Sequence, residues 1–140
     1  MEHYKRKVHY YETDKMGVVH HSNYIRWYEE ARTHFMQEIG FGYDGVEEMG
    51  IIIPVLSVSS KYILPFKYGE EFEVRIRVAQ YNGVKVSFEY EVYDTVTGKL
   101  KNTGTSQHCF VDSNFRPVAL KKAHPDFDAI IKALVAEEKE

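Results

Sequence analysis

The chain has 140 residues, of which 44% are apolar and 28% charged, the size and composition of a globular domain rather than a disordered segment. Its formal net charge of −3 at pH 7 argues against a nucleic-acid platform or an anionic-membrane binder, although a few local Lys or Arg residues can still hold an anionic ligand. Cys109 is the only cysteine, so neither an intramolecular disulfide nor a four-cysteine zinc site can form within one chain.

The N-terminal residues contain no apolar run of signal-peptide length, and no segment approaches the roughly 18 apolar residues of a membrane helix. A cytoplasmic location without a membrane span is therefore expected. Because no linker, internal repeat or low-complexity segment interrupts the sequence, we also expect one domain over residues 1–140.

Residues 5–11 are polar and β-prone and predict a short first strand that leads into a turn. A long amphipathic helix follows, because apolar residues recur at steps of three and four. Its apolar face comprises Tyr24, Trp27, Tyr28, Ala31, Phe35 and Ile39. On the polar face Arg26 and Glu30 are spaced to form an i,i+4 ion pair, and Ser22 or Asn23 can cap the helix start.

From residue 51 onward the apolar period changes to two, which predicts strands. The expected strands cover residues 51–63, 71–78, 84–92 and 100–112. Asn82-Gly83 is a strong hairpin signal, and the strands are expected to form an antiparallel meander. A short helix closes the chain, with Pro125 in its first turn. This order predicts an α+β fold rather than a parallel α/β sheet.

The segment from Tyr10 to Arg32 carries the chemistry. Asp14 is expected in a tight loop just before the long helix, where Gly17 permits close backbone approach. The first N–H groups of a helix lack an intrahelical acceptor and attract negative charge, so a substrate carbonyl there would meet an oxyanion hole beside a carboxylate. This arrangement suits acyl transfer, although an Asp in such a loop is more often a turn or cap residue.

His20 and His21 come directly before the helix and offer a metal pair or a general base. Adjacent histidines on an irregular segment are expected to point in different directions, and most such pairs are surface or packing residues. Trp27 and Tyr28, at helical spacing, are expected in the core. From the residues alone, the segment is a loop-plus-helix oxyanion site without a named reaction.

One run of residues is specific enough to suggest a family: Asp14-x-x-Gly17-Val18-Val19-His20-His21-Ser22-Asn23-Tyr24, followed by Trp27, Glu30, Ala31 and Arg32. It resembles the 4-hydroxybenzoyl-CoA thioesterase family, and within it the acyl-CoA thioesterase branch of the bacterial Tol-Pal-associated type. The resemblance extends over roughly residues 4–120. It includes the stretch Tyr62-x-x-Pro65-x-x-x-Gly69-Glu70 and the strand end Val111-Asp112.

The resemblance implies a hotdog fold, in which an antiparallel sheet of about five strands wraps around the long helix. It further implies that two protomers pair their sheets edge to edge, with active sites at the interface of a homodimer that can assemble into a homotetramer. The implied substrate is an acyl-CoA, with an acyl carrier protein thioester as a further possibility, and neither a cofactor nor a metal is implied.

By the same resemblance Asp14 is the catalytic carboxylate, either as nucleophile or as general base, and the backbone N–H of His21 polarises the thioester carbonyl. The residues expected to contact the substrate are Gly17, Val18, His20, Tyr24 and Lys85, with Lys85 as a contact for a CoA phosphate. Weaker candidates for phosphate contacts are Lys61, Arg75 and Arg77. Family members specific for 4-hydroxybenzoyl-CoA carry an aromatic residue and Pro in place of His21-Ser22, so an aliphatic acyl group is favoured here.

Two alternative functions stay open. A hotdog hydratase or dehydratase would carry a His after a Pro-containing segment such as N-P-x-H or H-F-P-G, and neither occurs; the one Pro–His adjacency is His124-Pro125. A non-catalytic acyl-CoA-binding module would have no use for the carboxylate of Asp14. The sequence leaves open the acyl chain length, the donor, the route taken by Asp14, and dimer against tetramer.

Overall fold

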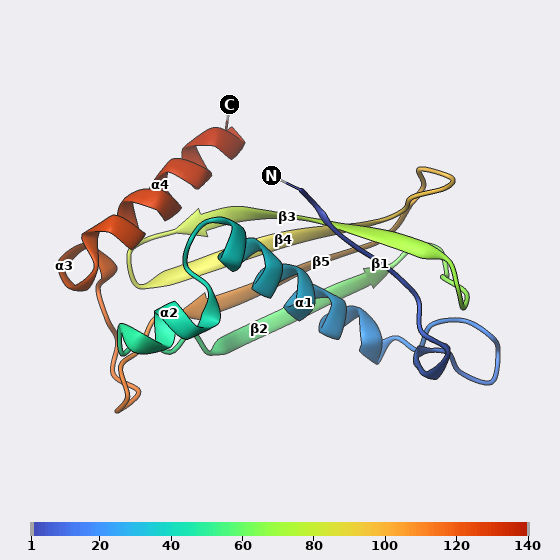
Figure 1. The fold of residues 1–140 in the computed structure, drawn as a ribbon, viewed down its shortest axis with the longest axis horizontal. Helices are drawn as coiled ribbons and strands as arrows, with labels where there is room; N and C mark the ends of the chain where they lie inside the picture. Colours follow the sequence, from blue (N-terminus) through green and yellow to red (C-terminus); the bar gives the residue numbers. More distant parts are fainter. Residues whose placement is uncertain (1, 140) are drawn as a thin grey trace.

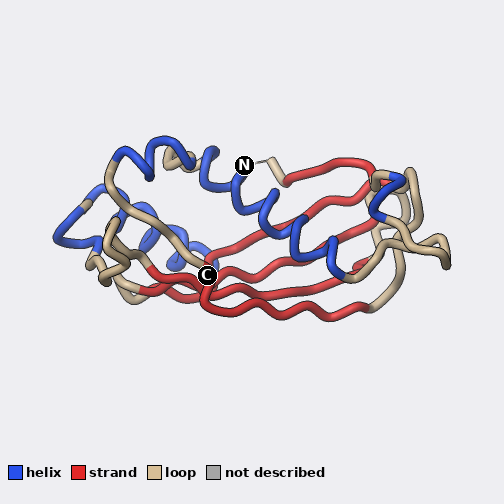
Figure 2. Tube along the Cα trace, turned by 90° about the horizontal axis from the view of Figure 1, so that it is seen from below, coloured by secondary structure: helices blue, strands red, loops and turns tan. Residues whose placement is uncertain are grey.

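A computed structural model describes residues 2–139, and within them five strands form one sheet with the helices packed on one face (Figure 1, Figure 2). The strands are β1 (Tyr4–Lys7), β2 (Val55–Tyr62), β3 (Glu71–Tyr81), β4 (Lys85–Asp94) and β5 (Leu100–Cys109). The helices are the 3-10 turn η1 (Tyr10–Glu12), α1 (Ser22–Glu38), α2 (Tyr43–Glu48), α3 (Leu120–Ala123) and α4 (Pro125–Lys139). The predicted α+β class with about five strands is confirmed.

The strand order in the sheet is β1-β3-β4-β5-β2, and all neighbours are antiparallel. Strands β3, β4 and β5 form the predicted meander. The prediction that the preceding strand belongs to this meander is wrong, because β1 occupies the free side of β3 and β2 crosses to the far edge beside β5. Within the described chain, the outer edge of β2 therefore has no strand neighbour.

Helix α1 lies across the sheet and buries the predicted aromatic stripe against it (Figure 2). The Trp27 ring stacks on Phe72 of β3 with centroids 3.8 Å apart, and the Tyr28 ring stacks on Tyr90 of β4 at 4.5 Å. Gly104 of β5 allows this close approach, because a Cβ at that position would overlap the Tyr28 ring. The predicted core positions of Trp27 and Tyr28 are confirmed.

The start of α1 differs from the prediction. The helix begins at Ser22, and the N-cap residue is His21, whose side chain makes no capping hydrogen bond. Asn23 is buried, and its side-chain amide donates to the Glu12 carbonyl at 2.9 Å. Neither Ser22 nor Asn23 acts as the cap, because the amide of Asn23 serves a contact eleven residues away instead.

The predicted i,i+4 pair on the polar face of α1 is wrong too. The Glu30 carboxylate accepts a hydrogen bond from Nε of Arg6 at 2.8 Å, and no ion pair joins it to Arg26 among the described side chains. Arg6 is only 17% exposed at its side chain, so its charge is less screened by water than that of the exposed Arg26.

The helices near the chain's middle and C-terminus are more extensive than predicted. Helix α2 was not predicted, because its six residues are too few to show an amphipathic period. The C-terminal helix begins at Pro125 as expected but runs for 15 residues, and its Phe127 ring stacks on Phe41 at 4.3 Å. None of the helices within residues 2–139 has the length and apolar character needed to cross a membrane.

One titratable side chain is fully enclosed beneath the helices. His108 of β5 is 0% exposed, shares a 2.7 Å hydrogen bond between its Nε2 and Ser106 Oγ, and has no partner for Nδ1 among the described residues. Burial and the nearby charge of Arg32 lower the pKa of His108 to about 4. The ring is therefore neutral in the folded protein at neutral pH.

We expect the folded state to lose stability as the pH falls from about 6.5 to about 4, since in this range the unfolded chain binds a proton at His108 that the folded chain does not. The measurement is the urea midpoint at pH 7 and pH 4.5 for the wild type and for His108→Gln, which does not titrate. A wild-type midpoint that drops no further than that of the variant contradicts the expectation.

Candidate functional site

Asp14 lies in a hairpin loop over residues 13–19 that joins η1 to α1. Thr13 and Val19 form a bridge at the base of this loop, and the Asp14 N–H donates to the Val18 carbonyl at 2.9 Å. The Asp14 carboxylate accepts the Met16 N–H through Oδ1 at 2.8 Å, so the residue does stabilise a turn. Its Oδ2 accepts no hydrogen bond from the described residues, and the side chain is only half-buried.

Two further residues of the predicted site shape this loop. Gly17 has φ +79°, a left-handed conformation that reverses the chain, and its N–H donates to the Asp14 carbonyl at 3.0 Å. Within the described chain no atom would lie within 4 Å of a Cβ at Gly17, so the close backbone approach that Gly17 permits stays a prediction. Val18 is half-buried and bridges to Lys67, which fixes the loop to the segment before β3.

The backbone N–H groups of residues 20–22, at the start of α1, differ in whether they have a hydrogen-bond acceptor. The His20 N–H donates to the Glu12 carbonyl at 2.8 Å, and the Ser22 N–H donates to Nδ1 of His20 at 3.2 Å. The His21 N–H has no acceptor within the described part of the chain. A free N–H at a helix N-terminus carries partial positive charge and can stabilise an oxyanion. It lies at the same end of α1 as the Asp14 loop (Figure 1).

The two histidine side chains do not point in different directions as expected. Their rings lie 4.1 Å apart at an interplanar angle of 31°, and both residues are exposed. The cause is a 2.8 Å hydrogen bond between Nδ1 of His20 and Ser22 Oγ, which holds the His20 ring over the helix start beside His21. Among the described residues, no group of three or more His, Cys, Asp or Glu side chains could hold a metal ion.

Of the remaining predicted contacts, only Tyr24 lies near the Asp14 loop within one protomer. Tyr24 is 3% exposed and packs against Trp27 and Phe66, so it belongs to the core beneath the loop. Lys85 pairs with Cys109 at the end of β5, whereas the Asp14 loop adjoins the strand ends near the start of β5 (Figure 1). The weaker candidates line a polar groove on the opposite face of the sheet: Lys61, Arg75 and Arg77.

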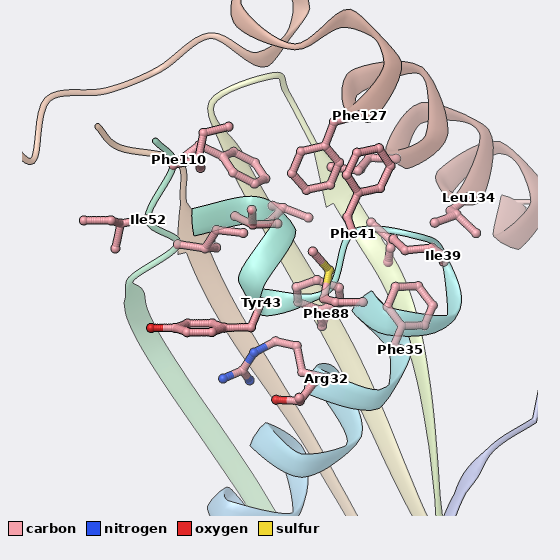
Figure 3. A pocket seen from close by; sticks show the side chains of 18 of the residues that line it. Arg32, Phe35, Ile39, Phe41, Tyr43, Ile52, Phe88, Phe110, Phe127 and Leu134 are labelled. Carbon is pink, nitrogen blue, oxygen red and sulfur yellow. The ribbon is translucent and has the colours of Figure 1, made fainter. Parts of the chain in front are cut away.

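A cavity of about 360 Å³ lies between the C-terminal half of α1, α2, α4 and the sheet (Figure 3). Its lining is largely apolar and includes Phe35, Ile53, Val86, Phe88, Phe110 and Phe127. Arg32 and Tyr43 turn their polar ends to the side away from Phe127 and Leu134 (Figure 3). A largely apolar hollow with few polar groups is typical of a small-molecule site, and this volume lies near the lower end of that range.

This cavity could not be predicted from the sequence, because α2 was not predicted and α4 was predicted without its contacts. The partly buried cluster of Arg6, Glu12 and Glu30 beside the Asp14 loop was not predicted either. The one available signal for the cluster was an acidic residue, Glu12, two positions before Asp14.

Comparisons with known proteins show the family and the fold of the chain. A family model for the thioesterase-like superfamily matches residues 8–133. YneP of Bacillus subtilis (strain 168), a proposed acyl-CoA thioesterase, is 38% identical over 122 residues, which cover 86% of this chain and 88% of YneP. A DHNA-CoA thioesterase from Staphylococcus aureus superposes with a TM-score of 0.92 and 30% identity, over 99% of this chain and 93% of that chain. The predicted hotdog fold is thereby confirmed.

Proposed function

Because the chain belongs to the thioesterase-like superfamily, we propose that it hydrolyses an aliphatic acyl-CoA to the free acid and CoA. The observation that carries this proposal is the position of the Asp14 carboxylate and the unpaired N–H of His21 at one end of α1. The name of YneP supports a CoA thioester as substrate. Membership of the Tol-Pal-associated branch stays a prediction.

The proposed chemistry uses few groups. The thioester carbonyl oxygen accepts the His21 N–H, and this hydrogen bond strengthens as the oxygen becomes an oxyanion. As general base, Asp14 takes a proton through Oδ2 from a water whose oxygen attacks the carbonyl carbon. As nucleophile, Oδ2 attacks that carbon itself and forms a mixed anhydride, which water then hydrolyses. In both routes the carbon–sulfur bond breaks and CoA leaves as a thiolate, which needs little acid assistance.

The cavity supports an aliphatic acyl group. An aryl group with hydroxyls, such as the DHNA moiety that the name of the S. aureus neighbour indicates, needs hydrogen-bond partners once buried. Most of the cavity walls are apolar and aromatic, and the polar side chains in the lining are those of Glu29, Arg32, Thr33, Tyr43 and Glu47. A saturated chain leaves no buried polar group unpaired there, and each methylene buried contributes about 0.8 kcal/mol.

The open edge of β2 supports a homodimer. Four of its apolar side chains are at least 40% exposed: Val55, Leu56, Val58 and Tyr62. Free backbone groups along an apolar edge favour pairing with another strand, and a second copy of the same edge is self-complementary about a two-fold axis. Because that axis lies perpendicular to the sheet, the two β2 strands would run antiparallel.

Antiparallel pairing would join the two halves of the site. The C-terminal end of β2 adjoins the Asp14 loop, because the Val19 N–H donates to the Phe66 carbonyl at 2.9 Å. The N-terminal end of β2 follows Ile52 and Ile53, which line the cavity. The cavity of one protomer, with Lys85 at the same end of the sheet, would thus face the Asp14 loop of the other. A homotetramer remains compatible with this pairing.

We expect Asp14→Asn to lower acyl-CoA turnover at least about a hundredfold, because Asn can act neither as a base nor as a nucleophile. The measurement is thiol release from acyl-CoAs of increasing chain length, benzoyl-CoA and DHNA-CoA. Asp112→Asn is the matched control, since Asp112 also accepts the N–H two residues ahead, at 2.8 Å from Asn114. If the wild type binds acyl-CoA but releases no thiol, the protein is a non-catalytic acyl-CoA-binding module and not a hydrolase.

We expect Val46→Phe, which reduces the cavity from the α2 side, to lower kcat/KM for long acyl chains while short ones keep theirs within about threefold. The reason is that a long acyl chain could then bury about four fewer methylenes, which costs about 3 kcal/mol of binding free energy, or roughly a hundredfold in kcat/KM. A short acyl chain would not reach the space that Phe fills. Val96→Phe, on a turn where Val96 is 86% exposed, is the control. If kcat/KM depends on acyl chain length in the same way as in the wild type, the acyl group does not bind in this cavity.

We expect Val58→Lys to convert a dimer, with twice the chain mass of 16.4 kDa, to the single-chain mass, because a charge on an edge strand opposes pairing. Turnover should fall with the dimer fraction if the site spans both protomers. Light scattering after size exclusion measures the mass, and Val96→Lys is the exposed control. A wild type that is monomeric and fully active contradicts the dimer.

A further inference from the structure

A partly buried ion cluster of Arg6, Glu12 and Glu30 lies between β1, η1 and α1, next to the Asp14 loop. Arg6 donates all five of its N–H groups: three to the carbonyl of Lys7 and the two oxygens of Glu12, and two to the Glu30 carboxylate. The Arg6–Glu12 contacts measure 2.9 and 2.7 Å, a parallel two-point pairing. The guanidinium also lies over the Phe72 ring at 5.1 Å, which excludes water from it.

Glu12 is the most enclosed member of this cluster, with 2% exposure. Its carboxylate accepts four hydrogen bonds, two from Arg6, one from the His9 N–H at 2.8 Å and one from Trp27 Nε1 at 2.8 Å. Burial alone would raise the pKa of the Glu12 carboxyl, but these donors hold it at about 2. The side chain is therefore charged and fixed in one orientation at all ordinary pH values.

The backbone of Glu12 holds the two ends of the Asp14 loop together. Its carbonyl accepts the His20 N–H at 2.8 Å and the Asn23 side-chain amide at 2.9 Å. The Glu12–His20 hydrogen bond thus joins the two ends of the loop: Asp14 comes two residues after Glu12, and His21 comes directly after His20. Any shift of Glu12 would therefore move the Asp14 carboxylate and the His21 N–H relative to each other.

We infer that Glu12, held by Arg6, which Glu30 holds in turn, is a positioning residue that sets the Asp14 carboxylate against the His21 N–H; the inference rests on the proposed function. Stability alone is a weak reason for such a cluster, because well-packed apolar residues often replace buried ion pairs without loss. What the cluster adds is fixed direction: β1, η1 and α1 are joined by hydrogen bonds of defined geometry. Displacement of a reacting group by about 1 Å can cost roughly a hundredfold in rate.

The test compares Glu12→Gln, Arg6→Lys and a matched control, Glu73→Gln. Glu73 is likewise a buried carboxylate on a neighbouring strand, bonded to Arg75 Nε at 2.8 Å and 3.7 Å from Lys5, but it does not contact the Asp14 loop. For each protein, kcat, KM, thermal midpoint and amide exchange of residues 13–21 are measured. We expect Glu12→Gln and Arg6→Lys to lower kcat at least about tenfold, with KM within about twofold, and to speed exchange in the loop. Glu73→Gln should change neither kcat nor the exchange rate of the loop amides.

A Glu12→Gln variant with a lower thermal midpoint but wild-type kcat and loop exchange at 25 °C would overturn the inference and leave a structural ion cluster. Where Glu12→Gln does not fold, Arg6→Lys decides, because Lys cannot make the parallel two-point contact. In an Asp14→Asn background, Glu12→Gln should cause no further loss of turnover, whereas an independent effect would add. If Asp14→Asn keeps full turnover, the proposed role of Asp14 fails, and if the wild type releases no thiol, the proposed function fails; in both cases loop exchange still shows whether Glu12 holds the loop.

Discussion

The stacking of α1 on the sheet determines where the helix N-terminus and the apolar cavity lie. Two parallel aromatic pairs, Trp27 with Phe72 and Tyr28 with Tyr90, fix the helix on adjacent strands, and each such pair adds about 0.5–1.5 kcal/mol beyond its buried area. With the helix fixed, its N-terminus lies at the Asp14 loop and its C-terminal half lines the cavity. A helix of 17 residues is about 25 Å long, so one protomer keeps these components at opposite ends.

The parts of the fold that sequence reasoning predicts well are those encoded by local period. The aromatic face of α1 and the alternation of Val86, Phe88, Tyr90 and Val92 on β4 both appear in the structure as written in the sequence. The pairing partner of β2 does not have such a signal, because alternation describes the faces of a strand and not its neighbour. Helix α2 was not predicted for a related reason: its one buried residue, Val46, cannot define a period.

The candidate site shows the same division between local and distant information. The family motif places Asp14 and His21 together in sequence, and the structure places them at one end of α1. Glu30 was assigned a partner four residues away, but it binds Arg6, 24 residues distant, which no spacing rule anticipates. Lys85 was predicted to contact a CoA phosphate, and within one protomer it lies at the other end of the sheet from the Asp14 loop, so which site it could reach depends on assembly rather than on sequence.

The placement of the cavity wall has a consequence for how such proteins diversify. Part of the cavity wall comes from α2 and α4, which follow the Asp14 loop in the chain and make no hydrogen bond to it among the described residues. Substitutions in these two helices can therefore change the size or polarity of the hollow without disturbing the carboxylate or the helix start. A fold organised in this way can acquire a new acyl specificity through single steps while its hydrolytic chemistry is inherited unchanged.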